Sequence, residues 1–186
     1  FTYVNKDYSN VRGVIITLDK RFNKYYGWHI DYTFQTAEGS NSNPDEEFGA
    51  ILGNNEPKRS IIPLNWDQRH TLNTSTYASF GNWGGHIIMQ YGSGYPYTPF
   101  YSSSSLQGQT IANVLIQNSR RKQPTINFDL KLFKNIKINN FKNGRIFLII
   151  NNLFDTRNEI TIWGDTGRSS GTAEQTLAEE NNDSLQ

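Results

Sequence analysis

The chain has 186 residues, and its 18 lysines and arginines nearly balance 17 aspartates and glutamates, so it lacks the basic surface that nucleic acid selects. Its hydrophobic fraction of 35% is low for a soluble core, but its aromatic fraction of 13% is high, which suits a barrel that needs apolar residues only at alternate strand positions. The longest apolar run, 146–150, excludes transmembrane helices, and the absence of cysteine excludes disulfides and thiolate metal sites.

The amino end has no charged start followed by an apolar segment, and it begins with Phe1, which indicates a processed chain or a piece of a longer one. The first predicted strand is 11–22, and residues 23–24 connect it to a second strand, 25–36, as a hairpin. The second strand gives the strongest signal because its even positions are mostly aromatic or aliphatic and its odd positions mostly polar. At about 3.3 Å per residue it reaches roughly 40 Å, enough to cross a bilayer.

Two more strands, 67–80 and 83–91, are predicted on either side of a sharp Gly81-Asn82 turn. The segment 123–134 alternates cleanly between apolar and polar residues. Residues 135–143 then connect it to a strand at 144–155.

Which face of that last strand is apolar stays open, because Phe147 and Ile149 oppose its other apolar residues. We expect a seventh short strand at 159–164. The remainder, 165–186, is polar and shows no clear periodicity.

The connections alternate between short and long, and the long ones, 38–65 and 92–121, are polar. This pattern is typical of outer-membrane barrels, which have tight turns at one end and large loops at the other. Aromatic residues also gather beside the predicted turns, where strands would meet the membrane surface. These turn-side aromatics are Phe22, Tyr25, Tyr26, Trp28, Phe80, Trp83, Phe133 and Phe141. The sequence therefore predicts an all-β fold, an antiparallel up-and-down meander.

Four stretches resemble the TonB-dependent outer-membrane receptors. They are N-V-R-G-V-I-I-T-L-D-K-R-F at 10–22, P-L-N-W-D-Q-R-H-T-L-N at 63–73, Y-G-S-G-Y-P-Y-T-P at 91–99, and N-N-L-F-D-T-R-N-E-I at 151–160 with G-D-T-G-R after it. They occur in the family's order and span most of the chain. The resemblance implies a partial segment of a large barrel of the 22-strand type, plugged by an amino-terminal domain.

On this resemblance, residues 1–186 form six or seven strands from the carboxyl-terminal part of the transmembrane barrel domain, without the plug domain or the last strands. Six or seven strands are too few to close, because single-chain membrane barrels start at about eight. The implied location is the outer membrane of a Gram-negative-type cell, with the long loops extracellular. The implied partners are outer-membrane lipid and lipopolysaccharide, the plug and remaining barrel strands, the TonB complex through the plug, and a surface lipoprotein lid.

The implied function is to supply wall and outer loops for active uptake of a scarce nutrient: a siderophore, cofactor, glycan or peptide. Two alternatives stay open: a non-transporting barrel that serves as an adhesin or structural protein, and a soluble β-barrel or sandwich that binds a ligand. No catalytic residue, metal ligand or cofactor is predicted. The three histidines, His29, His70 and His86, have neither metal-ligand spacing nor an acid cluster beside them, so we do not expect an enzyme.

Candidate ligand-binding residues lie in the second long loop. Tyr95, Tyr97, Phe100 and Tyr101 offer rings that could stack on a ligand entering from outside, although they also suit an aromatic belt or loop packing. Arg120 and Arg121 could attract an anion, although they also suit an ordinary basic rim. Asp67 and Arg69 share one strand face, and we expect such inward charges to contact a plug or water rather than substrate.

Overall fold

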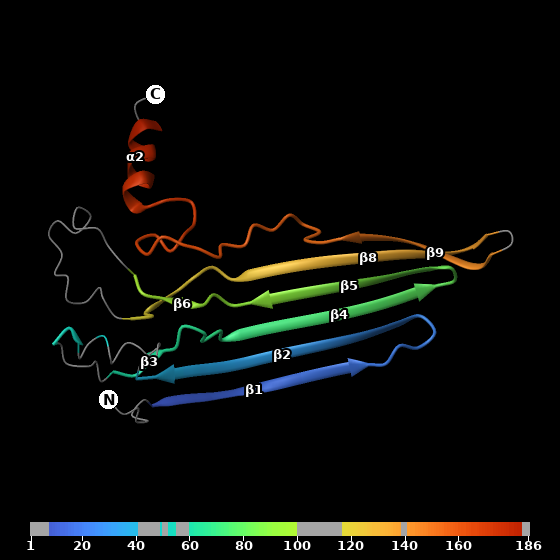
Figure 1. Ribbon diagram of the computed structural model, residues 1–186, viewed down its shortest axis with the longest axis horizontal. Helices are drawn as coiled ribbons and strands as arrows, with labels where there is room; N and C mark the ends of the chain where they lie inside the picture. The colour runs from blue at the N-terminus through green and yellow to red at the C-terminus, as the bar shows by residue number, and fades with distance from the viewer. Residues whose placement is uncertain are drawn as a thin grey trace.

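The computed structural model describes residues 8–40, 49, 52–54, 60–99, 117–138 and 141–183. Six long strands form one antiparallel sheet in the order β1-β2-β4-β5-β8-β9, so strands that follow each other along the chain are neighbours (Figure 1). Their bounds are Ser9–Lys20 for β1, Tyr26–Gly39 for β2, His70–Phe80 for β4, Trp83–Gly92 for β5, Thr125–Ile138 for β8 and Phe141–Ile150 for β9. The predicted all-β antiparallel meander is confirmed, and the sheet is open, with β1 and β9 at its edges.

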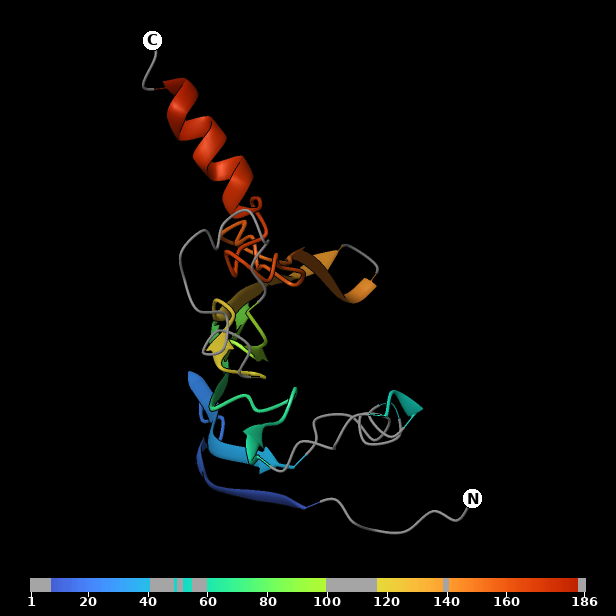
Figure 2. The ribbon, with the colours of Figure 1, turned by 90° about the vertical axis from the view of Figure 1, so that its left-hand side faces the viewer.

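Shorter elements lie at the loop end of the sheet. Strand β3 (Ile62–Pro63) pairs with β2, while β6 (Pro96–Tyr97) and β7 (Arg120–Arg121) pair with each other. A helix, α2 (Ala173–Asp183), projects away from the sheet (Figures 1 and 2). In the described part of the chain, no helix combines the length and the apolar character needed to span a membrane.

The predicted strand at 159–164 is wrong, because this segment is irregular. The side chain of Asn158 takes the place that a neighbouring strand would occupy. Its Oδ1 accepts from the backbone N–H of Ile126 at 2.9 Å, and its Nδ2 donates to the Ile126 carbonyl at 2.9 Å. With these backbone groups satisfied, no ladder continues beyond Asn158 on this side of β8.

Helix α2 was not predicted, although its start carries a capping box. The hydroxyl of Thr172 accepts from the N–H of Gln175 at 3.3 Å, and the Gln175 side chain accepts from the N–H of Thr172 at 3.0 Å. This reciprocal pair satisfies two backbone donors that a helix start leaves free. The T-x-x-Q spacing was the signal in the sequence.

The last hairpin also differs from the prediction. Strand β8 runs to Ile138 and β9 starts at Phe141, so the connection is shorter than 135–143. Strand β9 ends at Ile150 rather than at 155, because Asn152 and Asp155 take positive φ angles of 51° and 49°. Residues with such angles cannot continue an extended ladder.

The cross-strand register separates an apolar face from a polar face. Residues that face each other on successive strands form one row on each face. The apolar row, from β1 to β8, is Leu18, Ile30, Thr74, Met89 and Phe128. The adjacent row on the other face is Thr17, Asp31, Asn73, Gln90 and Asn127. The alternation predicted for the opening strand therefore extends across five strands.

Among the described residues, the side chains of the apolar face stay largely exposed. Val14 is 57% exposed, Ile87 45% and Leu148 54%, while Trp28, Tyr32 and Phe128 are half-buried. The buried apolar residues among the described ones are Ala37, Ile62, Leu64 and Phe133, together with Pro96 and Pro99. Few apolar side chains of the described residues are therefore buried.

The hairpins β1-β2, β4-β5 and β8-β9 lie at the end of the sheet opposite β3 and β6, on the right in Figure 1. In the first, the Asn23 side chain accepts from the backbone N–H groups of Tyr25 and Tyr26 at 3.0 and 3.2 Å, as in an Asx turn. In the second, Phe80 faces Trp83 across two residues, and Gly81 has a φ of 60°. Glycine at the first central position is typical of a type II′ turn.

Replacing Gly81 with valine is expected to destabilise the protein by roughly 1–2 kcal/mol, because a side chain strains the left-handed backbone. A Cβ there would meet nothing within 4 Å, so backbone strain is the whole cost. The midpoint of urea unfolding measures the loss. Asn82→Val is the control, since Asn82 does not take a positive φ; an equal loss in both variants would contradict this explanation.

Candidate binding site

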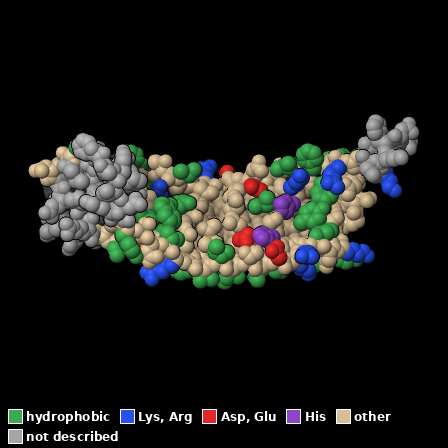
Figure 3. Space-filling model, turned by 60° about the horizontal axis from the view of Figure 1, so that its bottom comes forward, with side chains coloured by type: hydrophobic (Ala, Val, Ile, Leu, Met, Phe, Trp, Pro, Cys, Tyr) green, Lys and Arg blue, Asp and Glu red, His purple; other side chains and the backbone are tan. Residues whose placement is uncertain are grey.

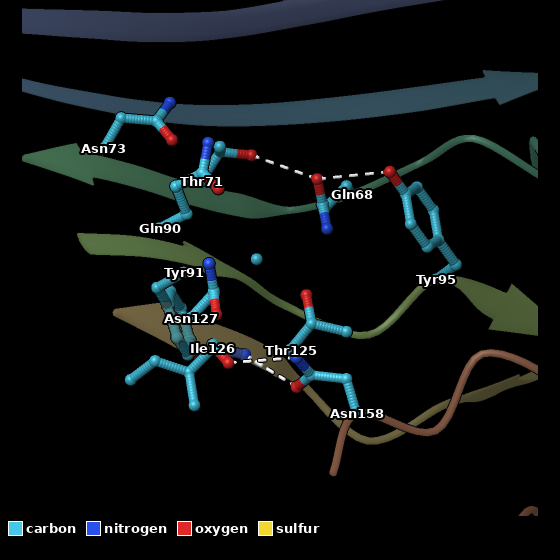
Figure 4. Close-up of a pocket in the computed structure, with 11 residues that line it drawn as sticks. Gln68, Thr71, Asn73, Gln90, Tyr91, Tyr95, Thr125, Ile126, Asn127 and Asn158 are labelled. Atoms are coloured by element: carbon cyan, nitrogen blue, oxygen red, sulfur yellow. Dashed lines mark hydrogen bonds between the residues drawn. The ribbon is translucent and has the colours of Figure 1, made fainter. Parts of the chain in front are cut away.

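A depression of about 270 Å³ lies on the polar face, where β4, β5 and β8 approach the long loops (Figure 4). Among the described residues, no lysine, arginine, histidine, aspartate or glutamate contributes to its lining. Besides threonine hydroxyls, two tyrosines, an isoleucine and a glycine, it holds five carboxamides. These belong to Gln68, Asn73, Gln90, Asn127 and Asn158.

Three of these carboxamides form a row across the sheet. Asn73 on β4 faces Gln90 on β5, and Gln90 faces Asn127 on β8. Within the described residues, the side chains of Asn73 and Gln90 have no hydrogen-bond partner, whereas Asn127 donates to Asp129 Oδ1 at 3.1 Å. Neighbouring strands are about 4.8 Å apart. The row therefore presents evenly spaced amide donors and acceptors to whatever occupies the depression.

Gln68 and Tyr95 close the end of the depression nearest the loops (Figure 4). The Gln68 amide donates to the Ser93 carbonyl at 3.0 Å, and its oxygen accepts from Thr71 at 3.3 Å and from the Tyr95 hydroxyl at 3.4 Å. Gly92 makes this placement possible, because a Cβ there would overlap the Gln68 amide. These contacts fix the Tyr95 ring while 42% of that residue stays exposed.

The wall beside β8 is built by the N-N-L-F-D-T-R-N stretch. Its Asn152 accepts from the N–H of Thr156 at 2.9 Å and donates to the Thr156 carbonyl at 3.2 Å. The N–H of Asn152 donates to Asp129 Oδ1 at 2.9 Å. This compact turn is thus held against β8, and it delivers Asn158 to the Ile126 backbone.

A buried ionic cluster around Asp67 supports the same end of the sheet. Asp67 is fully buried, and it accepts from the N–H of Ala37 at 2.8 Å, from Arg69 Nε at 3.1 Å and from Arg121 Nη2. Arg121 Nη1 also donates to the carbonyls of Asp67 at 2.7 Å and Gly94 at 3.1 Å. The cluster therefore connects β2, the start of β4, the loop after β5, and β7.

The environment of Asp67 favours its ionised form. Burial alone would raise the pKa of this carboxyl, but the hydrogen bonds from Ala37, Arg121 and Arg69 outweigh it and hold the pKa below its usual range. Both guanidinium groups lie close enough to neutralise the carboxylate.

Of the predicted site residues, Tyr95 is the one that lines the depression. Tyr97 is half-buried and lies against Gly167, where a Cβ would overlap its hydroxyl. Arg121 is bound to Asp67 and is absent from the lining, and Arg120 is exposed on β7. Phe100 and Tyr101 lie outside the described residues. Ligand binding by these residues stays a prediction.

A second polar cluster lies nearer the turns, where histidine, acidic and basic side chains gather on one face (Figure 3). His29 Nδ1 contacts Asp19 Oδ1 at 2.6 Å, and its Nε2 contacts Asp31, which accepts from Thr17 at 2.7 Å. Within the described part of the chain, no group of three or more histidine, cysteine, aspartate or glutamate residues has the geometry to hold a metal ion. The cluster is therefore a hydrogen-bonded network of the polar face.

A scan of protein-family models, a search of curated proteins and a search of solved structures each found no match.

Proposed function

We propose that the chain forms part of the wall and outer loops of a large outer-membrane β-barrel, and that the whole protein is a TonB-dependent transporter for a scarce nutrient. The observation that carries this proposal is the open sheet with one exposed apolar face and one polar face. Soluble monomers rarely expose a contiguous apolar patch of more than a few hundred Å². Lipid on the apolar side and water on the polar side would satisfy both faces.

Paired cations and aromatic rings at the turn end support a membrane interface there. Lys20 Nζ lies 3.9 Å from the Tyr26 ring centroid, and Lys134 Nζ lies 4.5 Å from that of Trp83. The Tyr25 and Phe80 rings stack at 5.9 Å between neighbouring hairpins. Aromatic rings favour the headgroup level, and lysines there extend their charge toward the headgroups.

The open edges support a larger assembly. Unpaired N–H and C=O groups along β1 and β9 are costly in lipid, so further strands would have to complete the barrel. The polar face would then line the interior, and the candidate binding site would lie at its extracellular end. The plug domain, the TonB complex, lipopolysaccharide and a lipoprotein lid enter this proposal through the sequence resemblance.

Cysteine labelling in intact cells tests the orientation, because the chain has no cysteine of its own. Ser170 is exposed at the loop end and Asn82 is exposed at the turn end. In a complete receptor otherwise free of cysteine, an impermeant maleimide should label Ser170→Cys in intact cells. It should label Asn82→Cys only after the outer membrane is opened. Equal labelling of both, or recovery in the soluble fraction, would contradict a membrane barrel.

Uptake by cells with and without TonB tests the transport step. We expect accumulation of the nutrient to require TonB, whereas an adhesin or structural barrel would show correct orientation and no such dependence. The two measurements separate the location of the protein from its activity.

A further inference from the structure

We propose that the depression on the polar face binds an uncharged, hydroxyl-rich molecule, in chemical class an oligosaccharide. This inference rests on the proposed function, since it names what the transporter takes up. The charge, the hydrogen-bonding groups and the shape of the depression all favour such a ligand.

The charge of the site favours a neutral ligand. Among the described residues, the lining contains no ionisable acid or base other than the two tyrosines, Tyr91 and Tyr95. Toward the loops, Glu38, Asp67, Arg69 and Arg121 are two acids and two bases that pair with one another. Two carboxylates lie beside the carboxamide row, because Asp31 faces Asn73 and Asp129 accepts from Asn127. Among these groups, no unpaired base is directed at the depression. An anionic iron chelate would thus lose its hydration without gaining a counter-charge.

The hydrogen-bonding groups match hydroxyls. A carboxamide offers donors and an acceptor together, and a hydroxyl likewise donates and accepts. Asn73 and Gln90 present complete carboxamides without a protein partner among the described residues, and Asn127 presents its oxygen. The strand spacing of about 4.8 Å lets one extended ligand meet all three in succession. Recognition would then depend on several hydroxyls, each matched to an amide.

The shape fits part of a longer molecule. Its volume of about 270 Å³ is slightly below the range of about 300–1,000 Å³ that is usual for ligand pockets, so it can hold only part of such a molecule. One end carries the Tyr95 ring, held through its hydroxyl by Gln68. The apolar C–H face of a sugar ring can stack on such an aromatic surface. The remaining sugar units of the oligosaccharide would lie along the carboxamide row.

The test is calorimetric binding to the purified complete receptor in detergent. The neutral probes are maltohexaose, cellohexaose and mannohexaose, and the anionic probes are an oligogalacturonate and ferric citrate. We expect at least one neutral probe to bind and the anionic probes not to bind. Asn73→Ala and Gln90→Ala should each weaken that binding about fivefold to tenfold, the loss expected for one hydrogen-bonded amide.

Two further variants complete the test: Thr74→Ala is the control, and Gly92→Ala is a second change that should weaken binding. Thr74→Ala changes the residue next to Asn73 on the opposite face and should leave affinity unchanged. Gly92→Ala should weaken binding because its Cβ displaces Gln68, a flexible side chain that can move without unfolding the sheet. Heat-modifiable migration on gels would show that each variant is folded.

Three results would overturn the oligosaccharide assignment: no binding of any neutral probe, binding of the anionic probes alone, or equal losses from Asn73→Ala and Thr74→Ala. If TonB-dependent uptake of an anionic chelate accompanies such a result, the transporter proposal stands and the ligand class alone is wrong. If uptake does not depend on TonB for any probe, the proposed function is wrong as well.

Discussion

Replacing Asp67 with alanine is expected to destabilise the loop end of the sheet by about 3–5 kcal/mol, the cost of removing one partner from a buried ion pair. The substitution leaves Arg69 and Arg121 without their shared carboxylate and the N–H of Ala37 without an acceptor. Urea unfolding in micelles measures the global loss. Limited trypsin digestion reports the local one, because the loop after β5 should be cut faster once Arg121 is released.

Arg12→Ala provides the control, since it breaks an exposed pair. Arg12 Nη2 lies 4.0 Å from Glu38 Oε2, and the Arg12 side chain is 73% exposed. Exposed pairs contribute at most about 1 kcal/mol. Similar losses from Asp67→Ala and Arg12→Ala would show that the buried cluster is not a special source of stability.

The low pKa of Asp67 predicts a loss of stability in acid. Its folded pKa lies below that of an unfolded aspartate, about 3.9, so its contribution is complete above that pH. As pH falls below about 4 and through the folded pKa, the carboxylate is protonated and the contribution is lost. Asp67→Asn, which cannot titrate, should show a shallower decline as the pH falls below about 4. Parallel acid profiles for the two proteins would contradict this assignment.

The sequence can predict the register of two strands only where the connection between them is short. The two-residue turn at Gly81-Asn82 fixes the register of its hairpin, so the pairing of Asn73 with Gln90 could have been predicted from the sequence. The pairing of Gln90 with Asn127 could not, because a long loop separates β5 from β8 and leaves their register undetermined. The carboxamide row could therefore be recognised only from the structure, which gives the register of β5 and β8.

The cluster around Asp67 shows a second limit. Asp67 and Arg121 are separated by 54 positions, and nothing in the local pattern links them. Periodicity assigned Asp67 and Arg69 to one strand face, but it could not show that Asp67 is buried or that Arg121 belongs to the same cluster. The segment after β9 was misread for a similar reason, because a single side chain, that of Asn158, replaces a strand.

Ile87→Arg is expected to lower the free energy of unfolding by about 2–4 kcal/mol, whereas Ile88→Arg should lower it far less. Ile87 lies in the middle of the apolar side of β5, beside Thr76 and Leu130. A guanidinium there must enter lipid, which is most expensive near the bilayer midplane. Ile88 faces the polar side between Ser75 and Asp129, where the guanidinium can pair with a carboxylate in water.

Comparing the two variants isolates the effect of the sheet face. Positions 87 and 88 are adjacent, both carry isoleucine, and both lie between β4 and β8. The measured quantity is the free energy of unfolding from lipid bilayers in urea, with folding followed by heat-modifiable migration on gels. A soluble sheet whose apolar face met water would tolerate arginine at 87, since the charge would stay hydrated. Equal, small losses at both positions would therefore contradict the lipid-facing assignment and the transporter proposal that depends on it.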